Sequence, residues 1–348
     1  MKFRVFSIFA AFFIVFIFTT NSFTQNIQQR NVSGSRKAIT GKEKPGIYDI
    51  RYSPDGKRLA VVIETGILIF NTQTDDKPEV FVEDIGRPWR VAFSPDGKTL
   101  TSVNSFGTIQ LRDAETKEHI RTLNNFPPEE SGHIMFSPDG STIAYRHRNK
   151  TVSLWDAKTE QRLQTFVGHS KYVRRIAFSL DGERIATGSD DQTVRVWDIN
   201  TGKPLLTLTG HAHSVQSIAF SPDGKYILSG DMRNTIRLWH ASTGELIRTL
   251  SDGQREDIYM GVVANVAFSP DGKLIAGAGG FSSHLWDAKT GEHLQILSGP
   301  RTSHTGHGGP WVMFSPDPDQ RIVASACLGE IQLWHVDTGK LIRTFSTD

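Results

Sequence analysis

FSPDGK, at residues 93–98, is one of seven near-copies of one short turn in a chain of 348 residues. Serine starts a type I turn, proline presets φ at the next position, and glycine takes the positive φ that lets the chain reverse. Successive turn serines are 41, 43, 42, 42, 48 and 46 residues apart, a period typical of repeated supersecondary units. The copies are YSPDGK (52–57), FSPDGK (93–98), FSPDGS (136–141), FSLDGE (178–183), FSPDGK (220–225), FSPDGK (268–273) and FSPDPD (314–319).

Each turn stands among four short apolar runs. Around the fourth copy these are IAF (176–178), RIATGS (184–189), TVRVWD (193–198) and, closing the unit, LLTL (205–208). Alternation and β-branched content predict four strands per unit, joined by hairpins at the SPDG and TG turns. Seven such units bury both their faces only by stacking radially into a closed ring. The sequence therefore predicts an all-β, seven-bladed β-propeller over residues 46–348.

Dipeptides that recur in the repeat units indicate a resemblance to a known family. With the period, they make the chain similar to the WD-repeat (Trp-Asp repeat) β-propeller family, in a bacterial secreted form. The dipeptides are Trp155-Asp156, Trp197-Asp198, Trp286-Asp287, Gly168-His169 and Gly210-His211.

The resemblance implies that Trp, Ser or Thr, His and Asp pin each blade through a buried polar network. Only blade four has the complete set, and Arg233 stands at the aspartate position of blade five. Blade three has Tyr145 and Asn149 at two of its network positions. Because a half-satisfied buried network is worse than none, we expect the incomplete blades to pack as plain apolar sheets. The structural-network residues are His169, Thr187, Asp191, Trp197, His211, Ser229 and Trp239.

Closure of the ring departs from the family pattern, in which the N-terminal segment usually supplies the outer strand of the last blade. Here blade seven has a fourth run of its own, LIRTF (341–345). The sequence leaves open what then locks the ring.

The N-terminus differs from the rest of the chain. Lys2 and Arg4 precede an uncharged apolar run at 5–18, which is shorter than the roughly 20 residues of a membrane-spanning helix. Residues 1–24 are predicted to be a signal peptide or N-terminal anchor, and 25–45 a polar linker. Either alternative places the propeller outside the cytoplasm, secreted or periplasmic, with membrane contact only through an uncleaved N-terminal segment. One unpaired cysteine, Cys327, suits a bacterial envelope better than a disulfide-rich extracellular module.

The sequence predicts no catalytic, cofactor or metal site. Ser, His and Asp recur in the blades, but no G-x-S-x-G elbow accompanies them, so we expect no hydrolase and no enzyme. His304 and His307 have a spacing that a shared metal would allow, but we expect them to lie in a solvated Gly-rich loop. The formal net charge is +2 and the basic residues are scattered, which is unlike a nucleic-acid binder.

The predicted function is a monomeric, non-enzymatic scaffold for protein or peptide partners. The alternative is a propeller enzyme or small-ligand sensor that uses the central channel. The longer steps into blades six and seven place extra residues at 251–264 and 299–310, on the face where each first strand begins.

We expect this face to bind partners, since aromatic and arginine side chains are the commonest interface anchors. Trp89, Tyr172 and Arg174 are the predicted anchors. The alternative is that Trp89 packs under a neighbouring loop and the arginines pair with nearby acids. The predicted partner-binding residues are Tyr48, Arg87, Trp89, Tyr172, Arg174, Asp190 and Gln216.

Overall fold

The computed structural model describes parts of one compact unit, Lys44–Asp348. Within these parts, no helix has the length and apolar character to cross a membrane. The predicted signal peptide, almost all of the linker, His304 and His307, and the long connections at 251–262 and 299–310 lie outside the described residues. The described residues are 45–81, 86–123, 134–233, 235–250, 263–279, 282–298, 311–327 and 329–347.

The prediction of seven four-stranded antiparallel blades is confirmed. In every blade the strands pair in sequence order, and the SPDG-type turn joins the first two. In blades four to seven a TG turn joins the last two. Blades one to three contain β1 (Ile47–Tyr52), β2 (Arg58–Ile63), β3 (Gly66–Asn71), β4 (Glu79–Phe81); β5 (Pro88–Phe93), β6 (Thr99–Asn104), β7 (Ile109–Asp113), β8 (His119–Leu123); β9 (Ile134–Phe136), β10 (Thr142–Arg146), β11 (Val152–Asp156) and β12 (Arg162–Phe166).

The remaining four blades repeat this order. Blades four to seven contain β13 (Val173–Phe178), β14 (Arg184–Ser189), β15 (Val194–Asp198), β16 (Pro204–Leu208); β17 (Val215–Phe220), β18 (Tyr226–Asp231), β19 (Ile236–His240), β20 (Leu246–Leu250); β21 (Val263–Phe268), β22 (Leu274–Gly279), β23 (Ser282–Asp287), β24 (His293–Ser298); β25 (Trp311–Phe314), β26 (Ile322–Cys327), β27 (Glu330–His335) and β28 (Leu341–Ser346).

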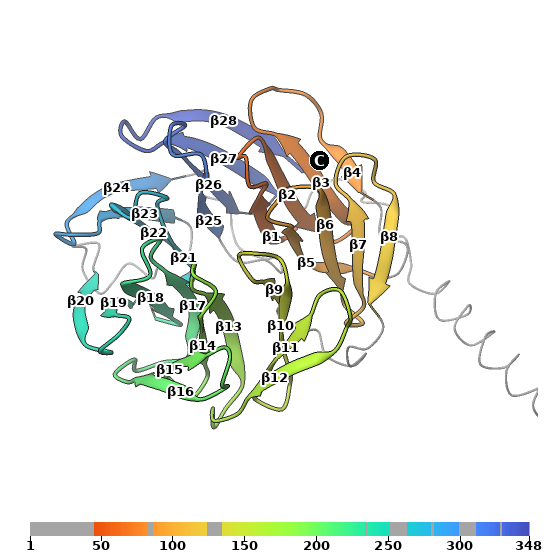
Figure 1. Cartoon of the computed structure of the whole chain (residues 1–348). Coiled ribbons are helices and arrows are strands. Elements are labelled where there is room, and N and C mark those ends of the chain that lie inside the picture. Colours follow the sequence, from red (N-terminus) through yellow and green to blue (C-terminus); the bar gives the residue numbers. More distant parts are fainter. Residues whose placement is uncertain are drawn as a thin grey trace, which may run out of the picture. The chain divides into compact units, whose positions relative to one another are not determined.

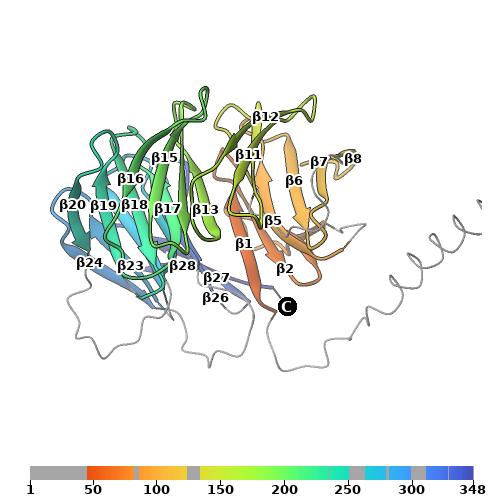
Figure 2. The same ribbon diagram turned by 90° about the horizontal axis from the view of Figure 1, so that it is seen from below.

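The blades form a ring in which the first strands are innermost and the fourth strands form the rim (Figure 1). Seen at right angles, the strands stand upright and the hairpin turns line the two faces of the ring (Figure 2). Among the described residues, seven hydrophobic clusters form, and each combines residues of two neighbouring blades. The core is therefore distributed over the blade interfaces, as radial stacking requires.

The structure shows why the same turn recurs. In blade two, the Ser94 hydroxyl donates to the Asp96 carboxylate (2.6 Å) and accepts from the Thr99 amide (2.9 Å). Asp96 also accepts from the Lys98 amide at 3.1 Å. Gly97, at φ 70°, donates its amide to the Ser94 carbonyl. Serine and aspartate thus satisfy the backbone donors that the reversal leaves unpaired.

Blade seven supplies its own fourth strand, β28, so no strand is exchanged at ring closure. Blades one and seven instead share a hydrophobic cluster in which the rings of Phe70 and Phe345 lie 4.9 Å apart. Arg343 donates to the Thr72 carbonyl at 2.8 Å. The ring is locked by side-chain packing and by hydrogen bonds between blades.

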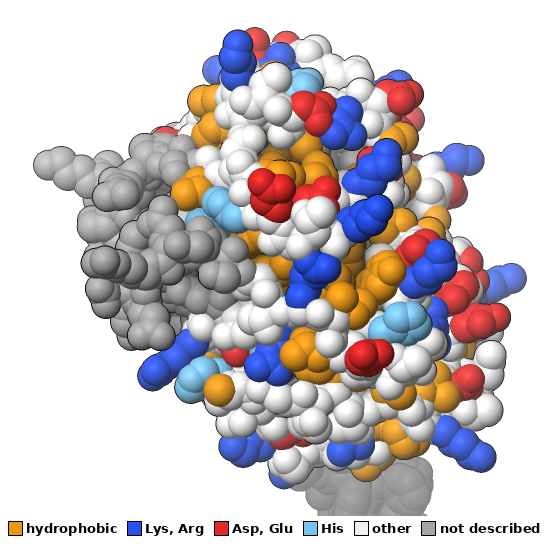
Figure 3. Space-filling model, turned by 90° about the vertical axis from the view of Figure 1, so that its left-hand side faces the viewer, with side chains coloured by type: hydrophobic (Ala, Val, Ile, Leu, Met, Phe, Trp, Pro, Cys, Tyr) orange, Lys and Arg blue, Asp and Glu red, His pale blue; other side chains and the backbone are white. Residues whose placement is uncertain are grey.

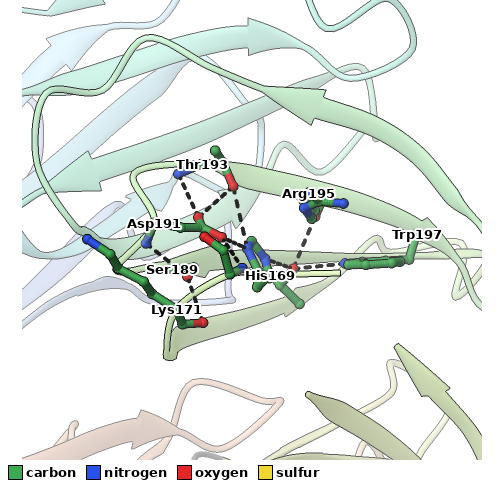
Figure 4. Close-up of polar contacts among 9 residues, drawn as sticks. His169, Lys171, Ser189, Asp191, Thr193, Arg195 and Trp197 are labelled. Carbon is green, nitrogen blue, oxygen red and sulfur yellow. Dashed lines mark hydrogen bonds and ion pairs between the residues drawn. The ribbon is translucent and has the colours of Figure 1, made fainter. Parts of the chain in front are cut away.

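In blade four the four predicted network residues form one hydrogen-bonded chain (Figure 4). Trp197 donates to the Thr187 hydroxyl at 2.8 Å, and this hydroxyl lies 2.8 Å from Nε2 of His169. Nδ1 of His169 is 2.8 Å from Asp191. Burial lowers the pKa of His169 despite the neighbouring carboxylate. A neutral imidazole that donates from Nδ1 and accepts at Nε2 satisfies every member of this chain.

The assignment of Arg233 to the aspartate position of blade five was wrong. His211 contacts Asp231 at 3.0 Å and Ser229 at 2.6 Å, and Trp239 donates to Ser229 at 2.7 Å. Asp231 is the last residue of β18, whereas Asp191 of blade four lies two residues beyond the end of β14. Blade five therefore has a complete network.

The expectation that the incomplete blades pack as plain apolar sheets was wrong for blades three and seven. In blade three, Nε2 of His147 lies 2.7 Å from the buried Ser153 hydroxyl. In blade seven, Trp334 donates to Ser325 at 2.8 Å. These blades keep shorter, locally satisfied polar pairs, because a tryptophan or histidine beside a hydroxyl needs no third partner to be hydrogen-bonded.

Candidate functional site

The first strands carry a β-bulge near their start. In blade four the pairing of β13 with β14 shifts between Val173 and Arg175, which leaves Arg174 as the extra residue. A bulge bends the strand and re-aims side chains, and it is common beside functional sites. The shift recurs in blades one, two, five and six. Four of the predicted partner-binding residues occupy this bulge position: Tyr48, Trp89, Arg174 and Gln216.

The predicted residues share one face of the ring. The Asp190 amide, in the loop between β14 and β15, donates to the Tyr172 carbonyl at 2.8 Å. Ser105, in the equivalent loop of blade two, donates to the Arg87 carbonyl. The segments that enter the first strands therefore lie beside the loops between second and third strands. We call this the first-strand face, and it lies opposite the SPDG turns.

On blades one and two, three predicted residues form an aromatic cluster: Tyr48, Arg87 and Trp89. The rings of Tyr48 and Trp89 meet edge to face at 5.1 Å. The Arg87 guanidinium lies 4.7 Å from the Tyr48 ring, donates to its hydroxyl and pairs with Glu64 at 3.3 Å. Burial raises the pKa of Tyr48, although the arginine opposes this. Tyr48 is buried and Trp89 packs on the interface of blades one and two.

A polar bridge joins blades four and five. Arg174 donates two bonds to Asp190, at 2.7 and 2.8 Å. Ser214 donates to the same carboxylate, and Gln216 donates to Ser214 at 2.6 Å. Although burial raises the pKa of Asp190, the bonds from Arg174 and Ser214 bring it below its usual range. The Arg174 guanidinium lies 5.1 Å from the Tyr172 ring.

The three predicted anchors have different environments. Trp89 is half-buried in the aromatic cluster, which matches the packing alternative for this residue. Arg174 pairs with an acid, as the same alternative proposed, yet its side chain remains 42% exposed. Tyr172 is half-buried between Arg174 and Arg146, whose guanidinium lies 4.5 Å from the ring. The polar bridge with Tyr172 is therefore the more accessible part of the predicted surface.

The sequence analysis missed a second set of residues, at the axis. Arg51, Arg90 and Arg175, from blades one, two and four, have their guanidinium carbons 5.7, 5.5 and 4.9 Å from the ring centroid of Trp311 in blade seven. Arg90, Arg175 and Trp311 stand four residues before a turn serine. Counting back from each SPDG motif would have found them.

The buried Thr, His and Asp side chains of blade four are hydrogen-bonded to one another and to Trp197. The Thr187 hydroxyl is fully buried and already joined to His169 and Trp197, so no substrate reaches it. In the described ranges, no three His, Cys, Asp or Glu side chains gather as a metal site would require.

On the side of the molecule drawn in Figure 3, acidic and basic side chains are intermixed around exposed hydrophobic ones, so this side has no continuous surface of one charge. Exposed aliphatic residues recur on the fourth strands, among them Leu246 in β20 and Leu294 in β24. Nothing on this side resembles the continuous basic stripe of a nucleic-acid binder.

A family model described as WD domain, G-beta repeat matches residues 160–198 and 202–240. Each match begins near the fourth strand of one blade and ends with the third strand of the next, and the two end in blades four and five. These are the blades with complete networks. Together with the seven blades, the matches support a WD-repeat propeller. Among curated proteins, none is similar enough in sequence to match this chain.

Proposed function

We propose that this protein is a non-enzymatic scaffold that binds protein or peptide partners on its first-strand face. The observation that carries the proposal is the arrangement of Tyr172, Arg174 and Asp190. An accessible arginine is held by two hydrogen bonds against a carboxylate and beside an aromatic ring. Such a side chain is pre-organised, so a partner that contacts it loses little additional conformational entropy on binding.

The fold supports a role in presenting a surface. Seven interfaces, each with its own hydrophobic cluster, hold the blades, and the first-strand face combines contributions from several of them. Propellers related to WD repeats commonly mediate protein interactions, and function in such a fold depends on the particular surface.

We further propose that the propeller acts as a monomer outside the cytoplasm, in a bacterial envelope or secreted. The basic start and apolar run at 1–24 support export, and the lone cysteine is compatible with it. Mass spectrometry of the native protein and fractionation of the cells would test this. A full-length protein in the cytoplasm would contradict it.

Partner binding is tested with tagged protein and chemical cross-linking in its native cells. Wild type is compared with Arg174→Ala and with Lys98→Ala, which removes an exposed positive charge on the opposite, SPDG-turn face. We expect a reproducible cross-linked partner that Arg174→Ala loses and Lys98→Ala keeps. Loss with Lys98→Ala alone would place the binding surface on the other face.

A further inference from the structure

In the six blades where it is described, the residue four positions before the turn serine occupies one equivalent place in the first strand. In blades one, two, four, five and six it directly follows the bulge, and in each described blade it pairs with the second strand in the same register. His133 of blade three lies outside the described residues. The others are Asp49, Arg90, Arg175, Ser217, Asn265 and Trp311.

Side chains from four blades meet at this level. The ring of Trp311 has Arg51, Arg90 and Arg175 around it, the nearest with its guanidinium carbon 4.9 Å from the ring centroid. We call these four residues the axial cluster. Because they come from blades one, two, four and seven, no single blade forms this cluster, and ring closure alone brings it together (Figure 1).

The axial cluster carries more positive charge than its neighbourhood compensates. Asp49 is fully buried, pairs with Arg51 at 3.0 Å and accepts from the amides of Ile50 and Val91. Within the described part of the chain, Arg90 and Arg175 form no ion pair. Burial lowers the pKa of Arg175 well below its usual value, and the charge of Arg90 lowers it further. The single carboxylate of Asp49 faces three arginines, and its charge favours the ionised forms of Arg90 and Arg175. Buried like charges that outnumber their counterions are costly unless something neutralises them.

Donors also remain available. Arg90 donates through Nη1 to the carbonyls of Tyr48 (2.5 Å) and Trp89 (3.0 Å), while its Nε is buried without a partner. Arg175 donates through Nε to Gln216 (3.0 Å) and through Nη2 to Ala264 (3.2 Å). These carbonyl bonds hold both guanidinium groups in place. Both residues nevertheless keep part of their surface exposed.

We propose that the axial cluster binds a small oxyanion, with Arg90 and Arg175 as its ligands. Guanidinium groups suit phosphate, sulfate and carboxylate groups alike, because their parallel N–H donors match paired anionic oxygens. The bound anion supplies the missing negative charge and accepts from Nη2 of Arg90 and Nη1 of Arg175, the terminal nitrogens that donate to no carbonyl among the described residues. Neither ligand is a member of the polar bridge, although Arg175 donates to the carbonyl of its Gln216. The proposal does not depend on partner binding there.

Isothermal titration calorimetry of the full chain with sodium phosphate tests the proposal, against sodium chloride at equal ionic strength. We expect saturable binding of phosphate. Arg90→Met and Arg175→Met should each weaken it by about tenfold or more, as loss of a charge-assisted hydrogen bond implies. Arg175→Lys keeps the charge and should weaken it less. A second titration with sodium acetate shows whether the site prefers a tetrahedral anion such as phosphate or a planar carboxylate. Saturable binding of either anion supports an oxyanion site.

The matched control is Arg58→Met. Arg58 likewise donates to two carbonyls, those of Ala114 and Gly97, and lies 5.3 Å from the Phe93 ring, but next to the SPDG turns. The Arg58→Met variant should bind phosphate with the affinity of the wild type. Melting curves without phosphate show which variants are folded. Absence of binding to wild type, or wild-type affinity in both folded axial Met variants, would overturn the proposal. Partner capture through Arg174 would be unaffected by that result.

Discussion

Nδ1 of His211 lies 3.0 Å from Oδ2 of Asp231, and both side chains are completely buried. In blade four the corresponding carboxylate belongs to Asp191, which lies in a loop and is slightly exposed. A buried histidine that loses its acceptor is left with an unsatisfied donor. The fully enclosed pair of blade five should therefore be at least as important for stability as the pair of blade four.

We accordingly expect Asp231→Ala to lower the free energy of unfolding by about 1–3 kcal/mol, with Asp191→Ala at or below that loss. Arg233→Ala, which removes an exposed side chain, should change it by less than about 0.5 kcal/mol. Urea denaturation of the three variants measures this. A loss from Arg233→Ala equal to that from Asp231→Ala would show that the network of blade five is incorrectly assigned.

The blade-four network should make stability depend on pH. Burial alone would raise the pKa of Asp191, but hydrogen bonds from Thr193 and His169 outweigh it and lower the pKa to about 2. Because the pKa of Asp191 is lower in the folded state than its unfolded value of 3.8, the ionised carboxylate stabilises the folded protein at pH values above 3.8. This stabilisation is lost as pH falls from about 4 towards 2. We expect a loss of about 1 kcal/mol, allowing for screening in this loop.

The measurement is urea unfolding at about pH 5 and about pH 3, for wild type and Asp191→Asn. The asparagine variant cannot titrate at this position, so its stability should fall less between the two pH values. Equal pH slopes would mean that Asp191 does not contribute to acid sensitivity.

Ring closure should depend on the aromatic contact between blades one and seven. Phe345→Ala removes a buried ring that lies 4.9 Å from Phe70, and should lower the free energy of unfolding by about 3 kcal/mol. Leu341→Ala, on the same strand but 47% exposed, should cost about 0.5 kcal/mol or less. Hydrogen exchange of β1 amides should accelerate in the Phe345 variant alone. Unchanged exchange there would indicate that another contact closes the ring.

Of the predicted anchors on the first-strand face, Trp89 should matter for stability and Arg174 mainly for partner binding. Trp89→Ala breaks the aromatic cluster and should lower the free energy of unfolding by about 2–3 kcal/mol. Arg174→Ala removes an exposed ion pair and should cost about 1 kcal/mol or less. Chemical denaturation of both variants checks this. A large loss from Arg174→Ala would show that the polar bridge is structural, and its use as a binding probe would fail.

The sequence by itself determined the blades. Strand alternation and the SPDG turn are local properties. In the turn, serine and aspartate make its hydrogen bonds to residues at most five positions away, and glycine adopts the positive φ of the chain reversal. Seven such units at a regular period leave radial stacking as the way to bury their faces. The blade-four network was likewise readable, because its residues hold their expected positions in the repeat.

Only the tertiary structure decided the rest. Asp231 and Arg233 are two residues apart at the end of a hairpin, where the chain bends back and either position can approach the same histidine nitrogen, so positional alignment chose the wrong residue. The axial cluster joins residues up to 260 positions apart. The SPDG register marks Arg90, Arg175 and Trp311 as equivalent positions, but it does not tell which side chains meet at the axis. Only ring closure brings Arg51, Arg90 and Arg175 around Trp311.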